Sequence, residues 1–313
     1  MNTLLTNELK TEIISWKPVK DLFSDIKNKD FPVETIGIQS GFFPVLLSMV
    51  QDEKDIPGNC VVVTSTEMEA EALARDLEEC GIEVNFFPWW NTMAYRPVPA
   101  GSPVFGRRIS ALARLMGKRS VTVMSQRCFL TPVPPPEYIR SLLIKVKPGD
   151  VLDTVELSGK LVSYGYIRVP KVTLRGEFAV RGEVLDIFLP QGNYPYRIIL
   201  DFDRIEKIKT FSAENQATTD DIEELEIYPS KEVVWTEDRV KNLDENLQKL
   251  PGFDVEKSKT AEILMLSSEI SGEEYFYPLA FSQKHSVLDY LDKNSLVFFA
   301  DSDRLENSKE VLF

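Results

Sequence analysis

The sequence is poor in the residue types that build most catalytic and metal centres. Its 313 residues include a single histidine, His285, and three widely spaced cysteines with no Cys-x-x-Cys pair, namely Cys60, Cys80 and Cys128. We therefore expect no zinc site and no disulfide framework, and we interpret the cysteines as reduced, buried thiols. No serine or cysteine motif accompanies His285, so we interpret it as a surface residue and not a catalytic base.

Long apolar segments and an excess of basic residues are also missing. The longest apolar run, residues 42–50, is too short to span a membrane, and the N-terminal residues lack the pattern of a signal peptide. We therefore expect a cytoplasmic protein without a membrane partner. The net charge of −13 excludes a general electrostatic affinity for DNA but not a local basic patch. With 43% hydrophobic residues, the chain can still build the cores of two domains.

The first part of the chain alternates short apolar runs with helical stretches, which is the pattern of an α/β fold. Four runs rich in Val, Ile and Phe predict buried parallel strands at residues 35–39, 59–64, 84–88 and 120–125. Residues 65–81 predict a helix that begins at a Ser or Thr and ends at Gly81. Residues 107–118 predict a second helix, with apolar residues at helical spacing.

The pattern changes at the proline-rich residues 132–140, which predict a domain boundary. A helix within residues 151–166 is followed by the neighbouring strands of an antiparallel meander at residues 176–190, 196–202 and 204–212. An apolar run at residues 295–301 again predicts a parallel strand. We therefore predict three parts, 1–133, 134–230 and 231–313, of which the middle one is inserted into the sheet shared by the other two. A separate third domain is the alternative.

Several segments resemble one protein family. Residues 87–95 (FPWWNTMAY), the helix at 107–115 and the segments 272–281 and 288–301 resemble elements of the bacterial transcription-repair coupling factors (Mfd). The most specific match is the central block, where GEFAVRG, LDIF and PYR within residues 164–212 resemble the second domain shared by UvrB and Mfd. The resemblance implies an N-terminal UvrB-homology module. Its fold would be a degenerate RecA-like (P-loop type) parallel sheet with an inserted α+β domain that binds UvrA.

An active ATPase of this class needs a phosphate-binding loop with Gly-Lys-Ser/Thr and an acidic pair that holds Mg²⁺ and activates water. The loop position carries Ser40, Gly41, Phe42, Phe43 and Pro44, with no basic residue. We expect its two phenyl rings to pack into the core at a strand-to-helix turn. The resemblance places the acidic pair at Asp301 and Ser302, where a hydroxyl replaces the catalytic Glu. We therefore predict no catalytic residue, cofactor or metal here, with ATP and Mg confined to the motor domains of a longer parent.

The sequence offers little that could grip DNA. The long aromatic hairpin expected after Tyr95 is replaced by a short loop rich in Pro and Gly, which argues against damage verification. A basic run comprises Arg107, Arg108, Arg114, Lys118 and Arg119. We interpret this run as a solvated helix face and not a phosphate-binding one. We interpret Trp89 and Trp90 as core and rim packing.

Strand alternation places Arg181 and Arg197 together on the polar face of the meander. Arginine suits a protein interface because its planar fork makes bidentate hydrogen bonds. The residues alone favour a simpler alternative, in which both arginines pair with Asp186, Asp201 or Asp203 inside the sheet. The resemblance implies instead that Arg181 and Arg197 bind UvrA.

The family also has an aromatic residue four positions after the second arginine. That position is Asp201 here, and Phe202 follows it. Either a one-residue shift supplies Phe202 to the partner or the contact differs. Alternation by itself places Phe202 on the face that holds Ile198 and Leu200, opposite Arg197.

The sequence and the resemblance together predict a non-catalytic module that docks UvrA and so brings nucleotide excision repair to stalled RNA polymerase. The parent would be an ATP-dependent DNA translocase that displaces stalled polymerase. Its other domains would bind DNA and RNA polymerase, and its C-terminal region would contact this module. Two alternatives are kept: an active UvrB-like, nucleotide-dependent DNA helicase subunit, and a DNA-binding module that uses the basic run.

Overall fold

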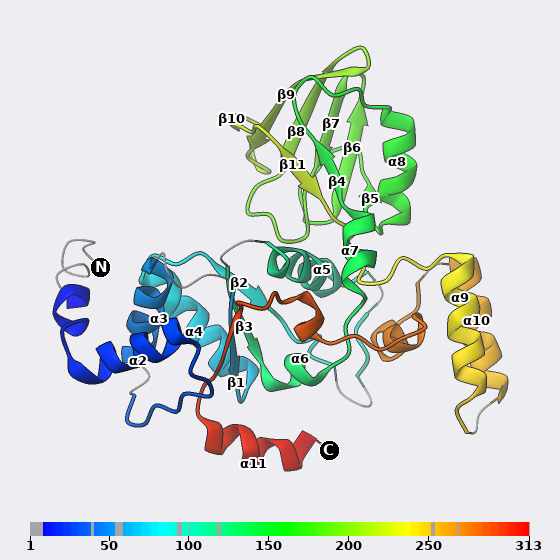
Figure 1. The fold of residues 1–313 in the computed structure, drawn as a ribbon. Coiled ribbons are helices and arrows are strands. Elements are labelled where there is room, and N and C mark those ends of the chain that lie inside the picture. The colour runs from blue at the N-terminus through cyan, green and yellow to red at the C-terminus, as the bar shows by residue number, and fades with distance from the viewer. Residues whose placement is uncertain are drawn as a thin grey trace. The chain divides into compact units, whose positions relative to one another are not determined.

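The computed structural model describes residues 9–38, 41–53, 59–92, 96–99, 101–117, 120–251, 254–267 and 269–312. The chain divides into two compact units (Figure 1). The first unit comprises Met1–Phe87, Arg114–Leu130 and Tyr290–Phe313, and the second comprises Pro88–Ala113 and Thr131–Asp289.

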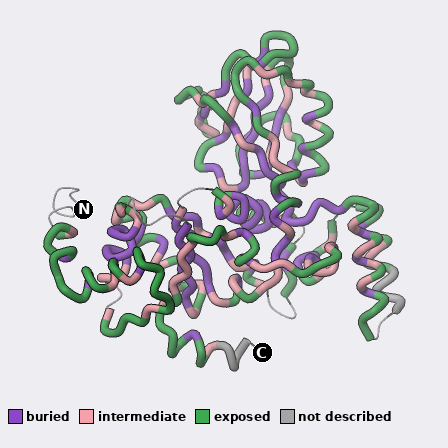
Figure 2. Tube along the Cα trace, viewed as in Figure 1, coloured by how far each residue is buried: buried purple, intermediate pink, exposed green. Residues whose placement is uncertain are grey.

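The first unit contains a four-stranded parallel sheet in the order β12-β1-β3-β2. Its strands are β1 (Cys60–Thr64), β2 (Val84–Phe87), β3 (Val121–Ser125) and β12 (Leu296–Phe299). β1 and β3 are buried along their whole length (Figure 2), as expected of central parallel strands that are covered on both faces. β12 pairs with β1 in parallel, so the predicted strand at 295–301 lies in the same sheet as the one at 59–64.

The helices of the first unit pack around this sheet. They are α2 (Lys17–Asn28), α3 (Phe42–Asp52), α4 (Glu67–Glu79), α6 (Gln126–Leu130) and α11 (Ser302–Leu312). α4 confirms the predicted helix and its capping signals. The Thr66 hydroxyl accepts from the backbone of Glu69 at 3.2 Å, and the Glu69 carboxylate accepts from the backbone of Thr66 at 3.3 Å. This capping box satisfies two of the free N–H groups at the helix start.

The strand predicted at residues 35–39 is wrong. Residues 35–38 have no regular secondary structure, Ile36 is 91% exposed, and Gln39 lies outside the described residues. Gly37 has a φ of +81°, which takes the backbone out of the extended region at the centre of the run. The other three predicted strands of this part are confirmed as β1, β2 and β3. Cys60 and Cys128 are buried as expected, whereas Cys80 is partly exposed.

The second unit contains a six-stranded sheet in the order β10-β9-β8-β7-β6-β5. Its strands are β5 (Ile167–Arg168), β6 (Glu177–Arg181), β7 (Val184–Ile187), β8 (Tyr196–Asp201), β9 (Arg204–Phe211) and β10 (Thr218–Asp221). β6 to β9 are successive antiparallel neighbours, which confirms the predicted meander. A two-stranded antiparallel sheet of β4 (Ile144–Val146) and β11 (Leu225–Ile227) accompanies it. Together with the parallel sheet and helices of the first unit, this arrangement confirms the α/β class.

The two faces of the six-stranded sheet differ in chemistry. One face packs against Leu157 and Leu161 of helix α8 (Thr154–Ser163) through strand residues such as Leu185 and Ile198, all of which are buried. Because side chains alternate along a strand, the opposite face carries the other set of residues. We call this opposite face the outer face; it comprises Ala179, Arg181, Val184, Asp186, Arg197, Ile199, Lys207 and Lys209.

The rest of the second unit is mainly helical. It contains most of α5 (Pro103–Leu115) and of the 3-10 turn η3 (Val287–Tyr290). The other elements are α7 (Pro136–Leu142), α9 (Glu237–Gln248), α10 (Asp254–Ser267) and the 3-10 turns η1 (Glu273–Tyr275) and η2 (Tyr277–Leu279). Trp90 is buried in a core with Phe105, Trp235 and Tyr277, which confirms its predicted packing role. Among the helices that the structure describes, none combines the length and the apolar character that crossing a membrane requires.

Candidate partner-binding site

A buried carboxylate, Asp186, lies at the centre of the outer face. Its side chain is fully buried, and a buried charge is stable only when it is paired. Arg197 donates to both oxygens, from Nε to Oδ1 at 2.7 Å and from Nη2 to Oδ2 at 3.0 Å. Arg181 donates from Nη2 to Oδ2 at 2.5 Å. The sheet register explains the arrangement, because Asp186 lies directly opposite Arg197 on β8 and Ala179 on β6.

Arg197 is held on several sides. Its guanidinium carbon lies 4.5 Å from the centre of the Phe211 ring, and its Nη1 donates to the Gln216 carbonyl at 3.3 Å. The hydrogen bonds from Arg197 to Asp186 raise the pKa of the guanidinium because they stabilise its charged form. Only 17% of the Arg197 side chain is exposed. Arg197 is therefore a fixed part of the sheet surface.

Arg181 is bound much more loosely. Its side chain is 47% exposed, and the contact with Asp186 is its one hydrogen bond within the part of the chain that the structure describes. The Nε and Nη1 groups of Arg181 thus keep free donors at the surface. A guanidinium that is oriented on one side and free on the other is well placed to donate hydrogen bonds to an acceptor group of a partner.

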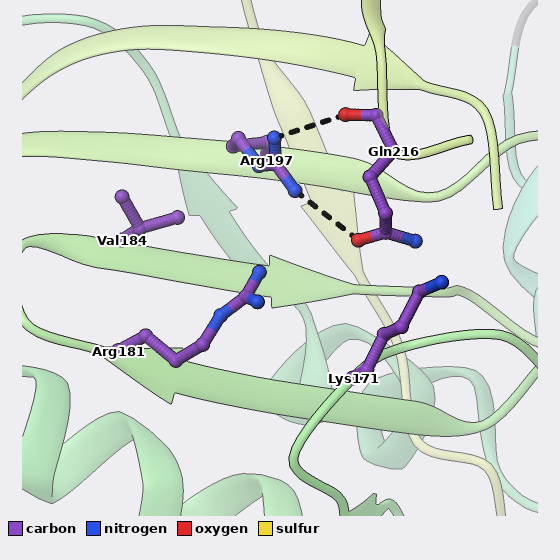
Figure 3. Close-up of a pocket in the computed structure, with 5 residues that line it drawn as sticks. All are labelled: Lys171, Arg181, Val184, Arg197 and Gln216. Atoms are coloured by element: carbon purple, nitrogen blue, oxygen red, sulfur yellow. Dashed lines mark hydrogen bonds between the residues drawn. The ribbon is translucent and has the colours of Figure 1, made fainter. Parts of the chain in front are cut away.

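A hollow of about 320 Å³ opens on the outer face beside these residues. It is lined by Lys171, Arg181, Val184, Arg197 and Gln216. Figure 3 shows the nitrogen-bearing ends of Lys171, Arg181 and Arg197 gathered around this hollow.

Two lining residues, Lys171 and Gln216, were missed by the sequence reasoning. Both lie in loops between strands, where no period relates them to the arginines. Gln216 Nε2 donates to the carbonyl of Val172 at 3.3 Å, which ties the loop that carries Lys171 to the end of β9. The one available signal was that Lys171 lies within the family-like block at residues 164–188.

The hairpin between β8 and β9 carries the other two predicted partner-binding residues. Asp201 pairs with Arg204 in the strand register, and Phe202 occupies the turn with a φ of +54° and 86% exposure. Strand alternation predicted that Phe202 shares the buried face of Ile198 and Leu200, and this prediction is wrong. The chain reverses after Asp201, so strand alternation ends there.

The predicted ion-pair alternative holds for Asp186 and not for the other two carboxylates. Asp186 is the partner of both arginines, whereas Asp201 and Asp203 form no ion pair within the described residues. Pairing with Asp186 and binding to a partner are nevertheless compatible. The same carboxylate that fixes Arg197 leaves Arg181 half exposed.

The predicted phosphate-loop residues lie where aromatic rings cover the start of α3. Phe42 stacks on Trp16 with 6.1 Å between ring centres, and Phe43 meets the edge of Phe298 at 6.3 Å. Pro44 is buried, Gly41 precedes the helix, and Ser40 lies outside the described residues. Both phenyl rings pack against the core of the first unit as predicted. The turn is not a strand-to-helix turn, because residues 35–38 form no strand.

The residues predicted as the acidic motif lie at the start of a helix. Asp301 has a φ of +62°, and its Oδ1 accepts from the backbone N–H of Arg304 at 3.2 Å, at the start of α11. Ser302 is the first residue of that helix. Asp301 therefore caps the start of α11. Over the described part of the chain, no group of three or more His, Cys, Asp or Glu residues is placed to hold a metal ion.

The interpretation of the basic run as a solvated helix face is wrong for Arg108. Arg108 is fully buried, and its Nε donates to Glu232 at 2.8 Å and its Nη1 to the carbonyl of Pro88 at 2.7 Å. Its guanidinium lies 4.1 Å from the centre of the Trp90 ring. Helical spacing places Arg108 with Phe105 and Leu112 on the buried side of α5, whereas Arg107 and Arg114 are exposed. Lys118 and Arg119 lie outside the described residues.

Comparisons with known proteins concern the same segments of the chain. Residues 144–233, which include Arg181, Asp186 and Arg197, match the family model of the UvrB interaction domain. The chain is 27% identical over 241 residues to the transcription-repair-coupling factor of Borreliella burgdorferi, covering 76% of this chain and 21% of that protein. It is 28% identical over 253 residues to the factor of Haemophilus influenzae, covering 80% and 22%, and 30% identical over 265 residues to that of Mycobacterium tuberculosis, covering 79% and 21%.

The chain therefore spans about a fifth of the length of the curated relatives it matches. The matched residues include both the inserted sheet and sequence outside it, since the similarity extends well beyond residues 144–233. Residues 144–233 thus match the UvrB interaction domain family, and most of the chain is similar to the bacterial transcription-repair coupling factors, as its sequence motifs predicted.

Proposed function

We propose that this chain is a recruitment module of a transcription-repair coupling factor that docks UvrA on the outer face of its six-stranded sheet. The observation that carries the proposal is the pairing of Arg181 and Arg197 on the buried carboxylate of Asp186, within a domain of the UvrB interaction family. By recruiting UvrA, the module brings nucleotide excision repair to a stalled RNA polymerase.

Preorganisation supports this role for Arg181. A free arginine side chain loses about 0.5–1.5 kcal/mol of conformational freedom when an interface immobilises it. The hydrogen bond to Asp186 already restricts Arg181, so less of that cost falls on docking. Arginine in a partly desolvated pocket is among the residues that contribute most to protein interfaces.

We further infer that this segment is not an enzyme and holds no nucleotide, cofactor or metal. The rings of Phe42 and Phe43 at the start of α3 and the hydroxyl of Ser302 beside Asp301 support this inference. ATP and Mg would belong to motor domains of the parent, a DNA translocase that displaces stalled polymerase. Those other domains would bind DNA and RNA polymerase, and the parent's C-terminal region would contact this module. Isothermal titration with ATP and Mg²⁺ is expected to give no binding heat, and micromolar binding would refute the inference.

A direct test is the affinity of the chain for UvrA from the same organism. Arg181→Ala is expected to weaken binding by about 30-fold or more, because it removes a hydrogen-bonded charge from the interface. Its circular dichroism spectrum and unfolding midpoint should stay close to wild type, since Arg181 is half exposed. Unchanged affinity of Arg181→Ala would contradict the proposed docking face.

Arg197 is the less suitable residue for this test. Removing Arg197 leaves Asp186 buried with a single partner, so a loss of binding could reflect unfolding. Phe202→Ala is the better second variant, because Phe202 is exposed at a hairpin tip and supports no core. If Phe202 replaces the aromatic contact of the family, Phe202→Ala weakens binding to UvrA. An Asp201→Ala variant measures the contribution of Asp201 to binding separately from that of Phe202.

The burial of Arg108 weakens the DNA-binding alternative. Arg108, one of the five residues of the basic run, is buried in an ion pair and cannot reach a phosphate. A gel shift at two salt concentrations checks this alternative, and tight, steeply salt-dependent binding would support it.

A further inference from the structure

Lys171 is a cation beside the outer face to which neither the sequence reasoning nor the family resemblance assigns a role. Its ammonium lines the same hollow as Arg181 and Arg197 (Figure 3). Within the residues that the structure describes, Lys171 has no hydrogen-bond or ion-pair partner. Its neighbour Val172 is fully buried, and the Val172 carbonyl accepts from Gln216. The backbone of Lys171 is therefore fixed, whereas its charge is free.

The hollow carries a surplus of positive charge. Three cations, Lys171, Arg181 and Arg197, line it, and among the described residues Asp186 is the one carboxylate bound to them. Arg197 directs its donors to Asp186 and Gln216, so its charge is largely satisfied within the sheet. The unsatisfied donors belong to Lys171 and Arg181, on either side of the same opening (Figure 3).

We propose that Lys171 and Arg181 form a receptor for one carboxylate side chain of the docked partner, and that Arg197 is a positioning residue that does not touch this carboxylate. The proposal rests on the proposed function, in which the partner is UvrA. Asp186 provides the chemical precedent, because it is a carboxylate already held by guanidinium groups at hydrogen-bond distance. A second carboxylate would use the free edge of Arg181 and the ammonium of Lys171.

The surrounding charges favour a single carboxylate over a nucleic-acid backbone. A phosphate backbone requires a row of available cations along its path. The other lysines of the outer face are already paired, Lys207 with Glu206 at 3.0 Å and Lys209 with Asp221 at 2.8 Å. The chain as a whole carries a net charge of −13, which repels a polyanion. Local attraction of one acidic side chain is compatible with that charge, since screening limits distant repulsion to about 8 Å at physiological salt.

The proposal is tested by measuring the affinity of the full 313-residue chain for UvrA. Lys171→Glu is expected to weaken binding by about 10-fold or more, because it replaces an attraction in the interface by a repulsion. Lys171→Arg, which keeps the charge, should stay within about 3-fold of wild type. The matched control is Lys160→Glu on α8, which packs on the opposite face of the sheet and should change affinity by less than about 2-fold.

Charge exchange with the partner identifies the ligand group. UvrA variants in which single surface Asp or Glu residues are changed to Lys are measured against Lys171→Glu. One of them is expected to restore most of the lost affinity while weakening binding to the wild-type chain. Failure of every such variant to restore binding would overturn the assignment of a carboxylate. Inorganic phosphate should compete no better than acetate at equal ionic strength, and selective competition by phosphate would likewise overturn it.

The outcomes separate this proposal from the docking proposal on which it rests. If Arg181→Ala loses affinity but Lys171→Glu behaves like Lys160→Glu, docking stands and the Lys171 receptor is wrong. If the wild-type chain does not bind UvrA, the docking proposal fails and the receptor fails with it.

Discussion

The chain contains two arginine–carboxylate clusters of the same chemistry in different surroundings. In one, Arg108 binds Glu232 and lies over Trp90, and both charged side chains are fully buried. In the other, Arg197 binds Asp186 and lies over Phe211, with Arg181 as a second, half-exposed cation. Each carboxylate is fully buried, so the two clusters differ mainly in whether an arginine side chain reaches the surface.

This difference separates a structural cluster from one that can also bind a partner. The Arg108 cluster has no exposed donor, so its consequence is confined to folding stability. The Asp186 cluster uses one arginine for the sheet and leaves part of the other at the surface, beside the free ammonium of Lys171. A buried carboxylate can thus orient a surface cation. Two measurements test this comparison, and a third extends it to a buried carboxylate with neutral donors; they follow from the largest expected effect to the smallest.

Breaking the buried cluster should have the largest effect on stability. Arg108→Met leaves Glu232 buried with the indole N–H of Trp90 as its remaining donor among the described residues, and is expected to lower the free energy of unfolding by about 3–5 kcal/mol. Urea denaturation followed by circular dichroism measures the change. Arg107→Met, at the exposed neighbouring position, is the control and should cost no more than about 0.5 kcal/mol.

If Arg108→Met does not fold at all, the double variant Arg108→Met/Glu232→Leu decides the cause. Replacing both members of a buried ion pair by apolar residues can be neutral, so the double variant should recover stability. The interpretation is refuted if Arg108→Met is as stable as Arg107→Met.

Within the Asp186 cluster, the two arginines should differ in their effects on stability. Arg197→Met removes two hydrogen bonds from buried Asp186, and should lower the free energy of unfolding by about 2 kcal/mol. Arg181→Met, at a half-exposed position, should cost about 1 kcal/mol or less. Adding Asp186→Asn to Arg197→Met should restore part of the loss, because no buried charge remains. Equal costs for the two arginines would contradict the division between a structural and a surface cation.

The smallest effect concerns a buried carboxylate that neutral donors hold. Glu273 accepts from the Tyr277 hydroxyl at 2.8 Å and from the Trp235 indole at 3.0 Å, and burial raises its pKa above the ordinary value of 4.5. The folded state therefore binds the proton more tightly, and stability falls as pH rises from 4.5 through the raised pKa. Glu273→Gln, which resembles the protonated form, should remove up to about 1.4 kcal/mol of this loss per pH unit.

The measurement is the free energy of unfolding in urea at a series of pH values. Glu245→Gln, at an exposed position on α9, controls for the change in net charge. A pH dependence that Glu273→Gln leaves unaltered would show that burial of this carboxylate does not contribute to it.

Where local signals were strong, the sequence predicted the structure well. The apolar runs that became β1, β2 and β3, the capping box of α4 and the meander of β6 to β9 all depend on short-range preferences or on alternation. The same reasoning failed at residues 35–38, where a glycine in the left-handed region interrupts an apolar pattern. It also failed at Phe202, because a chain reversal ends the alternation that placed it.

The sequence by itself determined which residues could serve as partner-binding candidates. These are two arginines that strand alternation places on the same face of the meander, within a block that resembles one family. Only the tertiary structure decided their roles. Helical spacing groups Arg108 with Phe105 and Leu112, but a charged residue at such a position is buried only if a partner such as Glu232 packs against it, and that partner lies 124 residues away. The placement of Lys171 beside the same hollow as Arg181 likewise depends on the hydrogen bond from Gln216 to Val172, which joins segments 44 residues apart and which no periodicity encodes.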